Sequence, residues 1–169
     1  LPDKIQRVLE DKERIQWFAS KYANAKDIFF IGRGLDYAIS LEGSLKMKEI
    51  SYIHSEAYAA GELKHGTISL ITENMPVIAV ATQMDLVEKT ISNIKEARAR
   101  GAFVILVAGS EVEIEEGVAD IIISLPDTPQ IFMPMTAAVP LQLIAYYTAV
   151  LKGNDVDKPR NLAKSVTVE

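Results

Sequence analysis

One lysine stands within the last residues of the chain, in a segment whose composition is unusual for a free tail. Gly153-Asn154 breaks any preceding helix, and Pro159–Glu169 then combines Lys164 with apolar side chains such as Leu162 and Val166. A tail that only trails into solvent is expected to be polar and low in complexity. This segment is therefore predicted to fold back over the body of the protein and to carry Lys164 with it. A lysine amine on such a flap suits imine formation with a carbonyl substrate.

Imine formation requires the neutral amine, and a lysine becomes neutral near pH 7 only when desolvation or a nearby positive charge lowers its pKa. The closed tail could supply the desolvation and Lys46 the positive charge. Taken alone, Lys164 would more often be an ordinary surface lysine. The imine interpretation therefore depends on what lies around it.

Three charged residues share one face of a predicted helix over about residues 37–54. Glu42, Lys46 and Glu49 stand at positions i, i+4 and i+7. Such a face is most simply solvated, with ion pairs contributing about 0.3–0.5 kcal/mol each. The alternative is a carboxylate base, tuned by an ammonium group, that moves a proton on a sugar carbon. The apolar residues of the same helix are predicted to face the core: Ile39, Leu41, Leu45, Met47 and Ile50.

The two histidines are expected to differ in role. His65 lies in the glycine-flanked stretch Gly61–Gly66, where a mobile imidazole that titrates near neutrality could transfer a proton to a sugar ring oxygen. An exposed histidine without any role is the simpler alternative. His54 is expected to cap the 37–54 helix or to pack beside its end, because a cation is favourable at a helix carboxyl terminus.

Hydrophobic periodicity predicts alternating strands and helices. Helices are expected at about 3–24, 37–54, 85–100 and 131–152, a short helical turn at 57–63, and buried strands at 27–32, 76–81, 102–108 and 120–125. This order predicts one α/β domain with a mainly parallel sheet covered by helices on both faces. Ligands of such sheets bind past the carboxyl ends of the strands. The first such loop, Gly32-Arg33-Gly34, is either a phosphate-binding turn or only a tight turn, with Arg33 as an anion contact or, more simply, a surface salt bridge.

Composition excludes several classes of protein. The 169 residues are 49% hydrophobic and 24% charged, which fits a soluble globular protein rather than a disordered one. A net charge of −5 argues against sequence-independent binding to nucleic acid, and the absence of cysteine excludes disulfides and thiol nucleophiles. The absence of cysteine also agrees with a reducing cytoplasm, and no apolar run long enough for a membrane span and no signal peptide are expected. Because the chain starts at Leu1, it is treated as a possible piece of a larger protein.

Three stretches resemble one family closely. They are Leu41–His54 (LEGSLKMKEISYIH), Glu56–Gly66 (EAYAAGELKHG) and Asp155–Glu169. The chain is similar over almost its whole length to glucosamine-6-phosphate synthase, also called glutamine–fructose-6-phosphate aminotransferase (isomerizing). Within that family it resembles the second sugar isomerase (SIS) subdomain followed by the C-terminal tail.

The resemblance implies a three-layer α/β/α SIS fold over residues 1–153 and a tail over 154–169 that closes over the active site. It implies that Lys164 forms the imine with the open-chain ketose phosphate and that Glu49 moves the proton between C1 and C2. Lys46 would lie close to the substrate, and Ala163 would line the sugar through its backbone. His65 would assist ring opening in the site of a neighbouring subunit.

The family's reaction converts fructose 6-phosphate and ammonia from glutamine into glucosamine 6-phosphate, and glucose 6-phosphate is a further expected ligand. The resemblance implies no metal and no organic cofactor. It also implies a homodimer and two absent partners on the same chain, a glutaminase domain and a first SIS subdomain.

Two departures from the family pattern bear on these expectations. The loop Ala81–Asp85 (ATQMD) lacks a serine- and threonine-rich pattern and carries an aspartate, so it is not expected to cradle a phosphate. Thr67 stands where the family often has proline, which is expected to loosen the loop that holds His65. This piece alone is therefore expected to be inactive. Two alternatives stay open: a regulatory SIS module that senses a phosphosugar, and a module that only self-associates through its long helices.

Overall fold

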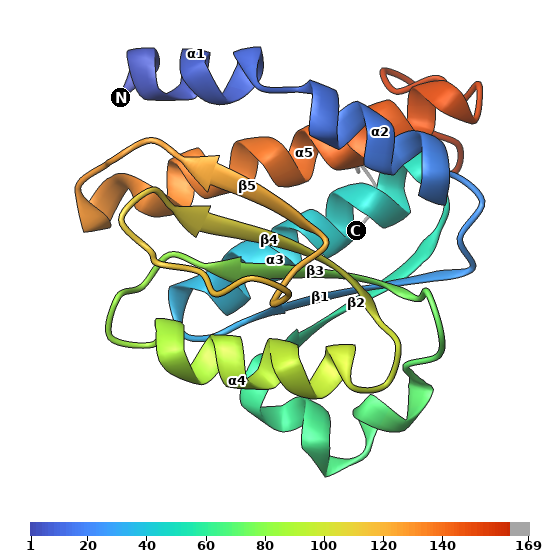
Figure 1. Ribbon diagram of the computed structural model, residues 1–169. Helices are drawn as coiled ribbons and strands as arrows, with labels where there is room; N and C mark the ends of the chain where they lie inside the picture. The colour runs from blue at the N-terminus through green and yellow to red at the C-terminus, as the bar shows by residue number, and fades with distance from the viewer. Residues whose placement is uncertain (163–169) are drawn as a thin grey trace, which may run out of the picture.

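The computed structural model describes residues 1–162, which form three layers around a central sheet (Figure 1). All strand pairs are parallel, and the spatial order is β2-β1-β3-β4-β5. The strands are β1 (Asp27–Gly32), β2 (His54–Ala59), β3 (Pro76–Ala81), β4 (Phe103–Gly109) and β5 (Ile121–Leu125). The predicted α/β class with a parallel sheet is confirmed.

Helices cover both faces of this sheet. The α-helices are α1 (Pro2–Glu10), α2 (Glu13–Tyr22), α3 (Leu35–Lys46), α4 (Val87–Arg98) and α5 (Met133–Leu151). A π-helix follows α3 at Met47–Ser51, and 3₁₀ helices lie at Ala60–His65, Thr67–Leu70 and Gln130–Phe132. In Figure 1, α2, α3 and α5 lie on one face of the sheet, and α4 and the 3₁₀ helices after β2 lie on the other.

The central strands are buried on both faces, as their continuous apolar runs predict. All six residues of β3 are buried, and their side chains alternate between two clusters. Ile78 belongs to the cluster that contains residues of α2 and α5, whereas Val77 and Ala79 belong to the cluster that contains residues of α4. Each fully buried isoleucine or valine stabilises the fold by about 1.5–3 kcal/mol relative to an exposed one.

The predicted helix over residues 3–24 is two helices. The chain leaves the helical conformation at Asp11, and α2 begins at Glu13. The buried residues Val8 and Ile15 are separated by a mostly charged run in which no residue is buried, so no side chain holds the chain against α5 in between. The helical spacing of apolar residues is therefore interrupted in this charged run between Val8 and Ile15.

The sequence-based assignment of residues 37–63 was wrong in two places. The helix ends at Ser51 rather than at residue 54. Residues 54–59, expected partly as a helical turn, form β2, a strand in addition to the four that were predicted. This strand lies at the edge of the sheet and pairs only with β1. Because one edge of β2 faces away from the sheet, polar residues such as His54 and Glu56 are tolerated there, and the apolar signal of a buried strand is missing.

Two leucines predicted to face the core do not. Leu41 and Leu45 are 46% and 43% exposed, whereas Met47 of the same prediction is fully buried. The buried face of α3 is made by small residues instead, and a Cβ atom at Gly43 would lie 2.9 Å from side-chain atoms of Phe30 and Leu141. Close approach of α3 to the sheet therefore depends on small side chains rather than on leucines.

One segment reaches the length and hydropathy of a membrane span, contrary to the expectation from the sequence. Gln130–Leu151, which contains α5, has a mean hydropathy of 1.3, and 44% of the scored window is buried. Residues on one face, including Ala137, Leu141 and Ile144, are fully buried against the sheet. The high hydropathy of this segment is therefore explained by its buried face, as in a core helix.

A buried carboxylate joins α3 to the end of β3. Asp36 is 2% exposed, and its carboxylate accepts hydrogen bonds from Thr82 N (2.8 Å), Thr82 Oγ1 (2.5 Å) and Gln83 N (3.4 Å). Burial raises the pKa of Asp36, and the hydrogen bonds from Thr82 and Gln83 oppose that rise only in part. Sequence analysis did not single out this residue.

Replacing Asp36 by alanine is expected to lower the free energy of unfolding by about 2–3 kcal/mol, because buried backbone donors lose their acceptor. A carboxyl whose pKa is raised by folding contributes stability that is present below its unfolded pKa and is lost as pH rises through its folded pKa. The difference between wild type and Asp36→Ala should therefore grow as pH falls from 7 towards 4. Urea unfolding at both pH values measures it, with exposed Asp85→Ala as the control. A constant difference, or one that shrinks on acidification, would contradict the assignment.

Candidate active site

The predicted charged face on residues 42–49 is present. Lys46 Nζ donates a hydrogen bond to Glu49 Oε2 at 2.6 Å and lies 3.8 Å from Glu42 Oε1. The side chains of Lys46 and Glu49 are 33% and 28% exposed, so this pair is shielded more than a freely solvated surface pair. The three residues predicted to share one face do so.

The same contacts fix the charge of Lys46. The hydrogen bond with Glu49 raises the pKa of Lys46, with the charges of Glu42 and Glu49 adding to the rise and partial burial opposing it. Lys46 therefore stays protonated at neutral pH. Because two carboxylates compensate its charge, Lys46 is a weaker source of positive potential for a second amine than the sequence alone suggested.

Glu49 is placed by an irregular helix end. Ser51 Oγ donates to Met47 O at 2.7 Å, which offers that carbonyl a partner other than the regular helical amide. The turn Met47–Ser51 widens to a π-helix, a form frequent at functional sites. Tyr52 then adopts a left-handed conformation (φ 60°, ψ 20°) and ends the helix. Few residues other than glycine take that conformation, so the helix end here could not be read from composition.

A cavity of about 540 Å³ opens beside Glu49. Its walls come from the end of α3, the π-helix, the start of β2 and the C-terminal segment. They comprise Leu45, Lys48, Glu49, Tyr52, Ile53, His54, Arg160, Asn161 and Leu162. The end of the described chain thus lies in the same cavity as the candidate base.

Two contacts hold this C-terminal segment against the body. Asn154 Nδ2 donates to Ile50 O at 2.9 Å, which supplies a partner to a carbonyl near the helix end. Farther along, the backbone N–H of Arg160 donates to Tyr52 Oη at 2.9 Å, and the guanidinium carbon lies 4.1 Å from the centre of the Tyr52 ring. Residues 154–162 are therefore folded back over the π-helix. Ala163 and Lys164, the two predicted site residues of the tail, lie outside the described residues.

His65 is on the other side of the sheet. It is exposed and ends the 3₁₀ helix Ala60–His65, which packs against α4, whereas the π-helix that carries Glu49 packs against α5 (Figure 1). Gly66 follows with φ 139°, a conformation that favours glycine. Within one chain the fold does not bring His65 to the cavity beside Glu49.

The loop Gly32-Arg33-Gly34 makes internal contacts. Arg33 donates from Nε and Nη2 to Asn93 Oδ1 at 3.1 and 2.9 Å, so within residues 1–162 its side-chain partner is an amide and not the carboxylate of the expected surface salt bridge. The side-chain amide of Gln83 donates to Arg33 O at 2.6 Å. Since Thr82 N and Gln83 N point at the Asp36 carboxylate, backbone donors at this edge already have an anionic partner inside the chain.

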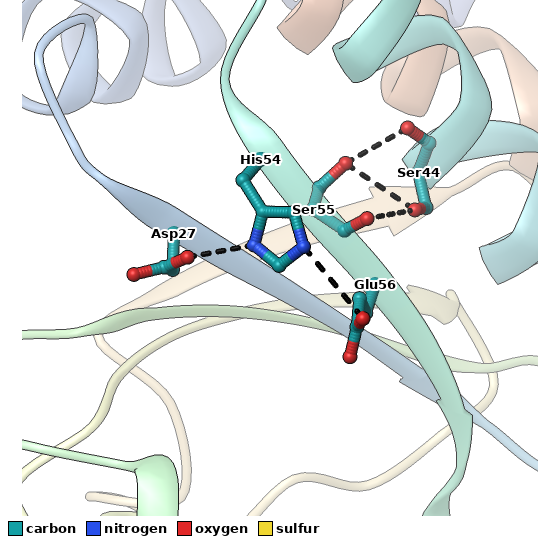
Figure 2. A network of polar contacts seen from close by, with 5 residues as sticks. All are labelled: Asp27, Ser44, His54, Ser55 and Glu56. Atoms are coloured by element: carbon teal, nitrogen blue, oxygen red, sulfur yellow. Dashed lines mark hydrogen bonds and ion pairs between the residues drawn. The ribbon is translucent and has the colours of Figure 1, made fainter.

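His54 is not a helix cap, because it is the first residue of β2 (Figure 2). Its Nδ1 lies 2.7 Å from Asp27 Oδ1, and its Nε2 lies 3.6 Å from Glu56 Oε1. Beside it, Ser55 Oγ donates to Ser44 O at 2.8 Å and Ser44 Oγ to Ser55 O at 3.0 Å, which joins α3 to the edge strand. These bonds hold the start of β2, and with it one wall of the cavity.

Of the nine residues that line this cavity, sequence analysis assigned only Glu49 to the site, and it did not anticipate the contributions of Tyr52, His54 and Arg160. No local pattern signals a contact such as that between Tyr52 and Arg160, which are 108 positions apart. Within residues 1–162, no three His, Asp or Glu side chains come together in an arrangement that could hold a metal ion.

Comparison with known proteins places this chain among sugar isomerase domains. Residues 21–152 match the family described as SIS domain. The chain is 63% identical over 169 residues to the glutamine–fructose-6-phosphate aminotransferase [isomerizing] of Caldanaerobacter subterraneus subsp. tengcongensis, and 57% identical to that of Clostridium tetani. Both alignments include the whole of this chain but only 28% of the relative, so the chain spans just over a quarter of the length of these proteins.

A solved structure gives the same assignment. The C-terminal domain of glucosamine-fructose-6-phosphate aminotransferase from Francisella tularensis superposes with a TM-score of 0.86 at 39% identity, over 91% of this chain and 43% of that one. The family match covers most of the chain, and its relatives align from the first residue to the last. This chain therefore belongs to the SIS domain family.

Proposed function

We propose that this chain is the isomerase half-module of a glucosamine-6-phosphate synthase. In the complete protein it would convert fructose 6-phosphate and glutamine-derived ammonia into glucosamine 6-phosphate. The observation that supports this most strongly is the shared cavity: Glu49, paired with Lys46, forms one wall and the C-terminal segment Arg160–Leu162 forms another. A carboxylate and a chain end that carries a lysine are the two groups that imine-dependent proton transfer needs.

In the proposed reaction the neutral amine of Lys164 attacks the C2 carbonyl of the open-chain ketose and releases water. Ammonia then displaces the lysine amine and leaves an imine at C2. Glu49 removes a proton from C1 and returns it to C2, and the proton lost from the C1 hydroxyl is balanced by one gained at the imine nitrogen, so that C1 becomes an aldehyde and C2 carries an amine. Lys46 holds Glu49 in place through their 2.6 Å hydrogen bond. Ala163 would line the sugar through its backbone.

The reach of the tail fits this assignment. Lys164 follows Leu162, a residue of the cavity wall, by two positions. Two residues of chain span at most about 7 Å, and the lysine side chain adds its own length. A Lys164 amine is therefore within reach of the cavity that Glu49 and Leu162 line.

The remaining parts of the site would come from outside this chain. The chain covers 28% of its curated relatives and 43% of the Francisella domain, which leaves room for a glutaminase domain and a first SIS subdomain that binds the phosphate. We infer that the isolated chain does not turn over substrate, that the complete protein works as a homodimer in the cytoplasm, and that it requires no metal or organic cofactor. His65, which is exposed and lies across the sheet from Glu49, would serve the neighbouring subunit by assisting ring opening.

Subunit mixing tests the activity and this arrangement together. The complete wild-type protein is expected to form glucosamine 6-phosphate, and His65→Ala and Lys164→Arg homodimers are expected to be inactive. If His65 acts across subunits, each mixed dimer has one intact site, so an equal, fully exchanged mixture should recover about a quarter of wild-type activity. Mixtures of each variant with itself are the controls. Absence of recovery after verified exchange would place His65 in its own subunit's site, and absence of product from the wild type would contradict the proposed function.

A further inference from the structure

The C-terminal segment touches the body of the protein at two separate points. Asn154 binds the carbonyl of Ile50 at the start of the segment, and Arg160 binds Tyr52 six residues later. Between these points, Asp155 Oδ1 accepts the backbone N–H groups of Asp157 (2.9 Å) and Lys158 (3.1 Å), so the intervening turn is shaped by its own side chain. The segment is therefore held in place by contacts within the chain itself.

Tyr52 uses both parts of its side chain in the second contact. Its hydroxyl accepts the Arg160 N–H at 2.9 Å, and its ring lies against the Arg160 guanidinium at 4.1 Å. The left-handed backbone of Tyr52 sets the position of this side chain at the end of the π-helix that carries Glu49. One residue thus connects the helix of the candidate base to the chain that leads to the candidate nucleophile.

The second contact shortens the tether of that nucleophile. Lys164 lies ten residues after Asn154 but only four after Arg160. The effective concentration of a tethered group falls roughly as the −3/2 power of tether length, so lengthening the tether from four to ten residues lowers it about fourfold. The Tyr52–Arg160 contact is therefore expected to raise the effective concentration of the Lys164 amine at a carbonyl carbon beside Glu49 by this factor.

We propose that Tyr52 and Arg160 form a clasp that positions the C-terminal segment for imine formation at Lys164. They are positioning residues, since neither is required to touch the sugar. The proposal rests on the function proposed above, because it assigns the clasp to the lysine of that reaction. It applies to the rate of imine formation and not to the binding of the sugar phosphate.

Three variants of the complete protein separate the parts of the clasp. Tyr52→Phe keeps the ring and removes the hydroxyl acceptor, Arg160→Lys keeps the backbone bond and the charge but loses the flat guanidinium, and Tyr52→Leu removes both contacts. The measurement is the single-turnover rate at which fructose 6-phosphate becomes fixed to the protein by borohydride. Tyr52→Leu should lower this rate about fourfold, with smaller decreases for the other two variants and an unchanged KM for the sugar.

Controls distinguish the clasp from a general structural effect. Tyr146→Phe and Arg100→Lys change exposed residues of the same types outside the cavity and should leave the rate unchanged. Thermal unfolding of all variants reports whether the fold is intact. Wild-type trapping rates in all three clasp variants, or a rise in KM that accounts for the whole loss, would overturn the proposal. Absence of any adduct in the wild type would instead count against the proposed function itself.

Discussion

Replacing Lys164 by arginine in the complete protein is expected to lower the rate of glucosamine 6-phosphate formation at least about a thousandfold, because a guanidinium stays protonated and cannot form an imine. The positive charge and the length of the side chain are nearly retained, so the fold and the docking of residues 154–162 should not change. Product formation from fructose 6-phosphate and glutamine measures the loss, and thermal unfolding reports the fold. Lys158→Arg is the matched control, since Lys158 is an exposed lysine of the same segment.

Two results would contradict the role of Lys164. One is a Lys164→Arg protein that still forms product at a rate near that of the wild type. The other is sugar fixed by borohydride to the arginine variant as efficiently as to the wild type, which would place the imine on another amine. Lys46 is a poor candidate for that amine, because its hydrogen bond with Glu49 raises its pKa.

Replacing Glu49 by glutamine is expected to slow exchange of the C1 hydrogen with solvent by about a hundredfold to ten thousandfold, the usual contribution of a general base. The amide keeps the size of the side chain but cannot take the proton. It also removes the charged partner that lies 2.6 Å from Lys46 Nζ. The incorporation of deuterium from heavy water at C1, with fructose 6-phosphate and ammonia both supplied, measures the exchange directly.

The control for this variant is Glu88→Gln, an exposed glutamate in the first turn of α4 on the other face of the sheet. It should leave the exchange rate unchanged. An exchange rate in Glu49→Gln equal to that of the wild type, with the protein folded, would remove Glu49 as the base. Imine trapping at Lys164 should persist in Glu49→Gln, because the carboxylate acts after the imine has formed.

The buried part of the fold was predictable from the sequence, and the edge was not. Strands β3 and β4 are continuous apolar runs, a pattern typical of parallel strands that are covered on both faces. Strand β2 has no such run: the side chains of His54 and Glu56 are accessible to solvent on this edge strand, and the buried Ser55 is hydrogen-bonded to Ser44. Its strand conformation comes from pairing with β1, a tertiary effect that local periodicity does not contain.

The helix faces show the same limit. Leucines at positions 41 and 45 follow a helical apolar spacing, but the sheet accepts the small residues Gly43 and Ser44 of α3 instead. Which face is buried depends on how closely two backbones approach, and this distance is not encoded in hydrophobicity alone. Leu41 and Leu45 are consequently exposed, although their spacing predicted that they face the core.

The candidate site was predictable in part. The spacing of Glu42, Lys46 and Glu49 was enough to place them on one face, and the ion pairs follow from it. The left-handed Tyr52, the π-turn before it and the contact of Tyr52 with Arg160 were not predictable, because each is fixed by groups distant in sequence. The resemblance to glucosamine-6-phosphate synthase supplied the roles of Lys164, Ala163 and His65, which remain proposals.

The central claim is that the amine of Lys164 meets the sugar carbonyl in the cavity beside Glu49. The most direct test is to reduce the complete protein with borohydride during incubation with fructose 6-phosphate and to locate the sugar by mass spectrometry of its peptides. The account predicts one adduct, on the peptide that carries Lys164, that disappears in Lys164→Arg. An adduct on a different lysine, or the absence of any adduct while the protein continues to form product, would contradict it.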